Sequence, residues 1–267
     1  MKKIFFPGPF RPHHSENKMQ SEGDIAKSRQ KFLTKRFNNL EFLLKKRFIW
    51  MNKFLKPKMK VIEIGSGSGF SKLYIKNKII LTDVAKKPWI DKKINAINMK
   101  IKTNSIDAII VSNALHHFSS PAKFLDECDR VLKKNGVILI NEPHTSFFMR
   151  LIMKIMKHEA YDYSVDVFDR EIICNDKNDP WSSNCAVSEL LFKNKKKFSE
   201  EFKKLTIVYQ KYDEFIVFPL SGGVVSKINM IELPIWVLKC FDLLDKILIT
   251  ISPSFFALGR RIVIKKL

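Results

Sequence analysis

The stretch that decides the fold is Lys60-Val61-Ile62-Glu63-Ile64-Gly65-Ser66-Gly67-Ser68-Gly69. A short apolar strand runs directly into a turn with glycine at every second position, and a helix is predicted from Phe70. A strand, a glycine turn and a helix together form a cradle for a phosphate or a nucleotide. The spacing differs from that of a dinucleotide site, because Phe70 stands where Gly-x-Gly-x-x-Gly has its third glycine. We therefore expect the glycines to bring backbone close to a ligand that has no pyrophosphate.

Strands and helices alternate along the chain that follows this turn. The further strands are predicted at residues 79–82, 107–112, 137–141, 205–209 and 261–264, with a short third strand that ends near residues 95–96. Helices are predicted at residues 70–76, 121–134 and 187–197. This alternation predicts an α/β fold with a doubly wound, mostly parallel sheet. Asp83 ends the second strand, where an acid is placed to accept hydrogen bonds from two ribose hydroxyls.

The remaining segments lie outside this alternation. Residues 1–56 are predicted to be a polar N-terminal arm followed by a long amphipathic helix at 27–55, where apolar residues recur every three or four positions. Residues 57–267 form the main domain. Within it, the polar and aromatic segment 143–185 reads as an insertion after the fifth strand. Because ligands of open α/β folds bind at that edge of the sheet, we expect this insertion to cap a substrate.

An apolar helix is predicted at residues 228–251. It has two interpretations, a helix that covers the sheet and a helix that lies on a membrane surface through Trp236, Lys239 and Lys246. We favour the first and keep peripheral contact with the inner membrane surface as the alternative. No apolar stretch is long enough to predict a transmembrane helix.

The composition is that of a folded protein, with 45% hydrophobic and 28% charged residues among 267. The four cysteines form no CxxC pair, which excludes a zinc ribbon and favours a reduced, cytoplasmic setting. The adjacent His13 and His14 have no further ligand at a suitable spacing, and we expect no metal site. Basic residues exceed acidic ones by 48 to 27, a net charge of +21. Either the compositional bias of an AT-rich genome or a functional basic surface explains this excess, and we favour the bias.

Several motifs in combination resemble those of class I S-adenosylmethionine-dependent methyltransferases, of the type 11-like kind. Residues 61–69 look like motif I of that family, and Leu81-Thr82-Asp83-Val84 looks like motif II. Ala114-Leu115-His116-His117-Phe118 and the run from Phe124 to Val137 are similar to later family motifs. The resemblance covers roughly residues 58–142. Glu142-Pro143, residues 219–223 and the ending at 257–264 also look like a group of little-characterised bacterial members.

The resemblance implies a Rossmann-like sheet of seven strands that binds S-adenosylmethionine at its carboxyl edge. It places Asp83 at the ribose, Val84, Asn95 and Ala96 at the adenine, and Asn113 near the methionine end. The residues that it assigns to the glycine loop are Glu63, Gly65, Ser66, Gly67 and Gly69. Asn95 departs from the usual aspartate and keeps an oxygen acceptor but not the charge, so we expect weaker cofactor affinity.

Methyl transfer needs mainly in-line positioning, although a hydroxyl acceptor can require a general base. We name His116, His117 and His144 as candidate bases, since they follow strand ends. His158, Tyr161 and Trp181 are candidates for contact with the acceptor. The interpretation of each as an ordinary structural residue stays open.

The acceptor class follows mostly from absent motifs. The chain has Ser112-Asn113-Ala114-Leu115 where enzymes that methylate base amino groups or glutamine carry a [DNS]PP[YF] motif. We therefore expect a small-molecule, sugar or lipid-linked acceptor, with no nucleic acid and no obligate protein partner. The alternatives are an RNA methyltransferase that uses the basic surface and a catalytically silent binding subunit with the same fold.

Overall fold

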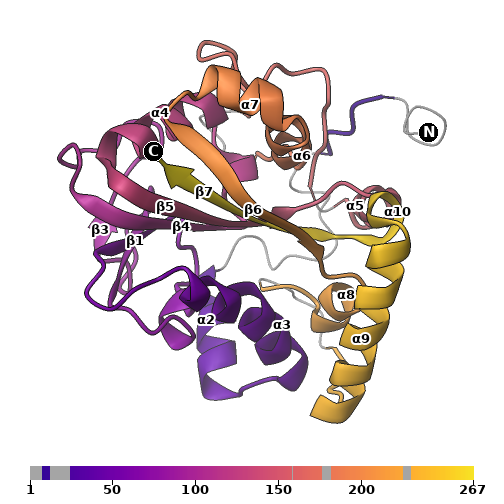
Figure 1. Ribbon diagram of the computed structural model, residues 1–267. Coiled ribbons are helices and arrows are strands. Elements are labelled where there is room, and N and C mark those ends of the chain that lie inside the picture. Colours follow the sequence, from indigo (N-terminus) through magenta and orange to yellow (C-terminus); the bar gives the residue numbers. More distant parts are fainter. Residues whose placement is uncertain (1–7, 13–24, 158, 176–181, 225–229) are drawn as a thin grey trace.

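A single seven-stranded sheet forms the centre of the computed structural model, which describes residues 8–12, 25–157, 159–175, 182–224 and 230–267 (Figure 1). Its strands stand in the order β3-β2-β1-β4-β5-β7-β6. They span β1 (Val61–Ile64), β2 (Ile79–Asp83), β3 (Lys92–Lys93), β4 (Ile106–Ser112), β5 (Leu132–Pro143), β6 (Leu205–Asp213) and β7 (Gly259–Lys266). Strands β1 to β5 pair in parallel, and β7 pairs antiparallel with β5 and β6. The predicted doubly wound, mostly parallel sheet is confirmed.

Helices cover both faces of the sheet (Figure 1). They are α2 (Ile25–Thr34), α3 (Asn38–Phe48), α4 (Pro121–Val131), α5 (Phe147–Met156), α6 (Ala186–Phe192), α7 (Lys195–Glu201), α8 (Val217–Ser221), α9 (Ile235–Ile251) and α10 (Pro253–Phe256). Side chains of β1 alternate between two cores: Ile62 belongs to the cluster that contains Phe124 of α4, whereas Val61 belongs to the cluster that contains Leu43 of α3. This two-residue period buries the strand on both faces, as expected for parallel strands.

The long helix predicted at residues 27–55 is wrong, because the chain breaks between α2 and α3. Phe37 has the extended backbone of an N-cap residue, at φ −72° and ψ 123°. The Asn39 amide donates to the carbonyl oxygens of Leu220 and Ile231, both at 2.9 Å. Tertiary contacts with a distant segment thus hold the break, while the apolar spacing continues across it.

Other element bounds also differ from the prediction. Only a 3₁₀ turn, Phe70–Leu73, follows the glycine loop, and the third strand, predicted to end near residues 95–96, is Lys92–Lys93. The helix predicted at 187–197 is two helices, with Asn194 accepting from Lys197 N as the N-cap of α7. Segment 143–185 contains the helix α5, whose N-cap is Ser146.

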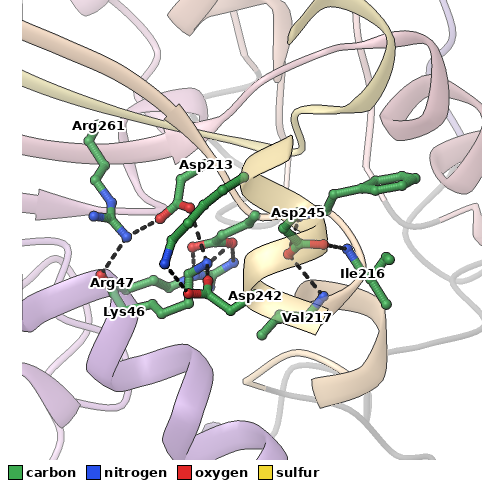
Figure 2. Close-up of polar contacts among 11 residues, drawn as sticks. Lys46, Arg47, Asp213, Ile216, Val217, Asp242, Asp245 and Arg261 are labelled. Atoms are coloured by element: carbon green, nitrogen blue, oxygen red, sulfur yellow. Dashed lines mark hydrogen bonds and ion pairs between the residues drawn. The ribbon is translucent and has the colours of Figure 1, made fainter. Parts of the chain in front are cut away.

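Ion pairs join α3 to the C-terminal half of the chain (Figure 2). Arg47 forms a two-pronged pair with Glu214, at 2.9 and 2.7 Å, and both side chains are buried. Lys46 contacts Asp213 and Asp242, and Asp213 also pairs with Arg261 of β7. The N-terminal helix is therefore part of the main body of the protein.

Asp245 of α9 positions the short helix α8. Its carboxylate accepts from the backbone N–H groups of Phe215, Ile216 and Val217 at 3.0, 2.7 and 3.3 Å (Figure 2). Asp245 is fully buried, and burial raises the pKa of its carboxyl. The start of α8 is thereby fixed to the side of α9.

Helix α9 packs against α3, α8 and β6 with a narrow face. Large apolar residues on its other side are exposed, namely Trp236, Leu243, Leu244, Ile247 and Ile251. The interpretation of this helix as a cover for the sheet accounts only for the narrow face. Among the described residues, no helix is long and apolar enough to cross a membrane.

Candidate active site

A cavity of about 1340 Å³ lies at the carboxyl ends of β1, β2 and β4. Its loop end is formed by the turns that follow these strands, residues 63–68, 83–85, 94–97 and 112–114. Its apolar end is formed by side chains from helices and loops elsewhere in the chain, including Leu44, Met149, Ile152, Met156, Phe218 and Met230. The strand order reverses between β1 and β4, the place where open α/β sheets bind their ligands.

The glycine loop adopts backbone conformations that favour glycine. Gly65, Gly67 and Gly69 have φ values of 68°, 49° and 65°. A Cβ on Gly65 would lie 2.7 Å from Cβ of Ala114, whereas a Cβ on Gly67 would meet no atom within 4 Å. Gly67 therefore presents bare backbone to the cavity. Gly69 does not line the cavity, and a Cβ there would lie 2.7 Å from Leu81 Cδ1, so it serves packing.

Two side chains hold the loop from outside. Trp89 Nε1 donates to the Gly67 carbonyl oxygen at 2.8 Å, and the Arg29 guanidinium donates to the Ser68 carbonyl. Arg29 also lies over the Trp89 ring, 5.0 Å from its centroid. The sequence analysis missed both residues, and the isolated tryptophan after the second strand was the available signal.

Asp83 connects the second strand to the glycine loop. One carboxylate oxygen accepts from Gly67 N at 2.9 Å and the other from Ala85 N at 3.0 Å. Carboxylate oxygens accept more than one hydrogen bond, so acceptor capacity remains toward the cavity. Asp83 thus lines the cavity at the strand end, where the resemblance placed it.

Glu63 lies beneath the loop and is almost fully buried, with 3% exposure. Its carboxylate accepts from Ser71 Oγ at 2.5 Å. Burial raises the pKa of Glu63 to about 7, although the hydrogen bonds from Ser71 and Ser66 lower it. A nearby cation would favour the ionised form of this carboxyl.

Val84, Asn95 and Ala96 line one side of the loop end. Val84 is 51% exposed, which leaves its side chain available for contact with a flat apolar ring. The Asn95 side-chain oxygen accepts from Ile97 N at 3.1 Å and so stabilises the turn as well.

The adjacent histidines occupy different environments. His116 is buried, and its Nδ1 lies 2.6 Å from Glu142, a fully buried carboxylate that also accepts from Ala114 N and Leu115 N. Burial alone would lower the pKa of His116, but Glu142 and Glu159 together raise it to about 10. His117 lines the cavity, and its Nδ1 donates to the Ser182 carbonyl at 3.0 Å. Burial and the charge of His116 lower the pKa of His117 to about 4.

His144 and Tyr161 lie near the cavity but do not line it. His144 is 4% exposed, and its ring packs against Tyr212, with Nδ1 3.3 Å from Arg260. Tyr161 is fully buried and pairs through its backbone with Phe10 of the N-terminal arm. His158 and Trp181 lie outside the described residues. Of the three candidate bases, His117 is therefore the one that the cavity reaches.

Segment 143–185 contributes Pro143, Met149, Ile152, Met156 and Glu159 to the cavity wall. The three middle residues come from α5, which the sequence analysis did not predict. Phe218 and Pro219 of α8, the helix that Asp245 positions, also line the cavity, and Phe218 packs in one cluster with Met149. The buried pair Arg47 and Glu214 also borders this space. The apolar end is thus assembled by tertiary contacts.

Comparisons with known proteins found a family model and solved structures to which the chain is similar. Residues 62–140 match the family model of a methyltransferase domain. A solved SAM-dependent methyltransferase from Archaeoglobus fulgidus is 18% identical, with a TM-score of 0.52 over 84% of this chain and 93% of that one. Another from Methanosarcina mazei is 16% identical, with a TM-score of 0.47 over 82% and 98% of the two chains. No curated protein matches the sequence.

The matched segment contains the glycine loop, Asp83 and the two histidines, and of these Gly65, Gly67, Asp83 and His117 line one cavity. Bare backbone at Gly67, a carboxylate at the end of β2 and an exposed apolar side chain beside it suit a nucleoside with a charged tail. Residues 62–140 thus form a methyltransferase domain, and the fold of the chain is that of a solved SAM-dependent methyltransferase.

Proposed function

We propose that this enzyme transfers the methyl group of S-adenosylmethionine to a small-molecule, sugar or lipid-linked acceptor that enters the apolar end of the cavity. The observation that carries the proposal is the cavity itself. Its volume of about 1340 Å³ exceeds the roughly 300–1,000 Å³ of a usual small-ligand pocket. Space beyond the loop end is therefore available for a second molecule.

The loop end would hold the cofactor, which supplies an electrophilic methyl group when bound. Asp83 would accept hydrogen bonds from the ribose hydroxyls, and Val84, Asn95 and Ala96 would border the adenine. Backbone of Gly65, Ser66 and Gly67 would pass beside the methionine part, with Asn113 at the strand end opposite. Glu63, which keeps the loop in place through Ser71, adds negative potential under a cationic ligand.

The apolar end favours an acceptor with an apolar portion. Met149, Ile152 and Met156 of α5 face it together with Phe218. Unbranched methionine side chains adapt to irregular apolar ligands. Among the three acceptor classes, a lipid-linked compound uses this surface most fully.

We further propose that the exposed apolar face of α9 rests on an anionic membrane surface. Trp236, Ile247 and Ile251 are 69%, 51% and 71% exposed, which is unusual for residues of this size on a soluble helix. Lys239 and Lys246 lie on the same helix, and the chain carries a net charge of +21. Apolar side chains next to basic ones are the features of helices that lie in a lipid interface.

The acceptor class is tested by following a labelled methyl group. The protein is incubated with tritiated S-adenosylmethionine and, separately, with the lipid, water-soluble and RNA fractions of a cell extract. We expect label in the lipid or water-soluble fraction, with the lipid fraction favoured. Label confined to RNA would overturn the proposal and support the basic surface as an RNA-binding one, whose binding would weaken steeply with salt.

Contact with a membrane is tested by sedimentation with phosphatidylcholine vesicles containing phosphatidylglycerol. Replacing Trp236 and Ile247 with Ser should lower the bound fraction about tenfold, because two large apolar side chains no longer enter the interface. The matched control replaces Ile172 and Ile173, which are 40% and 54% exposed elsewhere on the surface. Equal binding by both double variants would exclude α9 as the contact.

A further inference from the structure

The two histidines and Glu159 form a cluster that methyl transfer in general does not require. One nitrogen or oxygen atom from each of His116, His117 and Glu159 lies within 4.8 Å of those from the other two. Among them, His116 Nε2 stands 3.4 Å from Glu159 Oε1. His117 and Glu159 line the cavity, whereas His116 forms the buried side of the cluster.

Both rings are oriented in the way that metal-binding histidines are oriented. His116 Nδ1 donates to Glu142 at 2.6 Å, and His117 Nδ1 donates to the Ser182 carbonyl at 3.0 Å. A ligating histidine usually donates its other ring N–H to a carboxylate or a backbone carbonyl. Because Nδ1 of each ring is used, Nε2 is the atom that each ring can offer to a metal ion, and binding at His116 displaces the Nε2 proton.

An unsatisfied buried atom gives independent support. His116 is 1% exposed, and its Nε2 makes no well-aligned hydrogen bond among the described residues, since its polar neighbour, the Glu159 carboxylate, lies 3.4 Å away as an ion pair. Leaving such an atom unpaired is costly, so native proteins seldom do so without a functional reason. Glu159 is itself held, because the Cys185 thiol donates to its second oxygen at 2.8 Å.

We propose that His116 Nε2, His117 Nε2 and the Glu159 carboxylate bind one divalent transition-metal ion, of which Zn²⁺ is the best match. Two histidines and one glutamate are a known ligand set of catalytic zinc sites, in which the remaining coordination position is open to water or substrate. The charges also match, because a divalent cation balances the carboxylates of Glu142 and Glu159. The expectation of no metal site rested on sequence spacing, and Glu159 is far from the histidines in sequence.

The site lies beside the loop end of the cavity. Ala114 and Phe118 flank the two histidines in the chain, and these are the side chains that a Cβ on Gly65 would meet, at 2.7 and 3.8 Å. An ion here would present its open positions to the cavity, where a hydroxyl or carboxylate oxygen of the acceptor could bind. A bound cation lowers the pKa of such a hydroxyl, which then releases its proton to solvent more readily. Only this role rests on the proposed function, whereas binding of the ion does not.

The test uses the full chain without an affinity tag, treated with chelator and titrated with Zn²⁺ alone in a calorimeter. We expect one equivalent to bind the parental protein. His117→Ala and Glu159→Gln should each weaken binding about 100-fold or more, since even supporting residues typically contribute 10- to 100-fold. The control His13→Ala/His14→Ala removes the other adjacent histidine pair and should bind as the parental protein does.

Urea unfolding shows whether each variant is folded. If His117→Ala does not fold, the Zn²⁺ titration of Glu159→Gln decides the outcome. Absence of saturable binding by the parental protein would overturn the proposal. So would one equivalent retained by both variants, or binding lost only in the His13/His14 variant. Because neither cofactor, acceptor nor turnover enters the measurement, such a failure would leave the methyltransferase proposal untouched.

Discussion

The loop end of the cavity is built from turns that follow three neighbouring strands, whereas the apolar end is assembled from helices far apart in the chain. At the loop end, backbone atoms and short polar contacts such as Asp83 to Gly67 determine the shape. At the apolar end, α3 is held by a buried ion pair and the start of α8 by the Asp245 cap, whereas α5 packs against α10. The loop end, shaped by backbone, suits a ligand that is the same in related enzymes, namely the cofactor. The apolar end, shaped by side chains of separate helices, can differ between enzymes that use that cofactor.

The largest expected effect comes from breaking the buried pair that borders the apolar end. Replacing Arg47 with Met leaves Glu214 buried without its partner, which should lower the free energy of unfolding by about 3–5 kcal/mol. Urea denaturation measures this directly. The matched control is Lys72→Met, whose pair with Asp91 is 43% exposed on each side and should contribute less than about 1 kcal/mol. Equal losses in both variants would show that burial of the pair is unimportant.

Glu63 predicts a pH dependence that belongs to the loop end. Its pKa is raised from 4.5 to about 7, so the native state holds the proton more tightly than the unfolded chain. The favourable contribution is complete below pH 4.5 and is lost as pH rises through about 7. The shift in the pKa of Glu63 corresponds to a loss of about 3 kcal/mol at most in the free energy of unfolding.

Replacing Glu63 with Gln should remove this dependence of stability on pH. In the absence of cofactor, the free energy of unfolding of the variant should therefore rise relative to that of the parent as the pH increases from 4.5 to 7. Urea midpoints across that range measure it. Glu127 gives a control of opposite sign, because its hydrogen bond with Arg130 lowers its pKa. Its stabilising contribution is present above the ordinary pKa, and Glu127→Gln should lose stability there. A Glu63 variant that tracks the parent at every pH would contradict the assignment.

Asp83 tests the cofactor contact itself. Asp83→Ala should weaken S-adenosylhomocysteine binding roughly ten- to hundredfold, because a charge-assisted pair contributes about 1.5–3 kcal/mol. Calorimetry measures the dissociation constant. Asp91→Ala is the matched control, since Asp91 also accepts from a backbone N–H of β2 but does not line the cavity. An unchanged constant for Asp83→Ala would mean that this carboxylate does not face the ribose.

The contrast between the two ends also explains what the sequence could predict. The glycine turn, the alternation of strands and helices, and Asp83 at a strand end depend on local spacing, and the structure places them as expected. Gly69 was assigned to the cofactor as well, but its neighbours are Leu81 and Trp89, a packing role that spacing alone does not reveal. The break before α3 depends on Asn39 reaching residues 220 and 231, which no local pattern contains.

The acceptor side was harder to predict for the same reason. The insertion at 143–185 was expected to reach the cavity through His144, His158 and Tyr161, yet its described lining residues include Met149, Ile152 and Glu159 instead. His144 and Tyr161 face Tyr212 and Phe10, contacts made by tertiary packing. The roles of His158 and Trp181, which lie outside the described residues, stay predictions.

The most direct test of the two-ended cavity compares Ile152→Glu with Ile155→Glu on the same helix. Ile152 lines the apolar end, whereas Ile155 is 56% exposed and does not. Transfer of labelled methyl to the accepting fraction and the dissociation constant for S-adenosylhomocysteine are measured on both variants. The account predicts that Ile152→Glu lowers transfer at least tenfold while cofactor affinity stays within about threefold, and that Ile155→Glu changes neither. Loss of cofactor affinity in Ile152→Glu as large as that of Asp83→Ala, or parental transfer in Ile152→Glu, would contradict it.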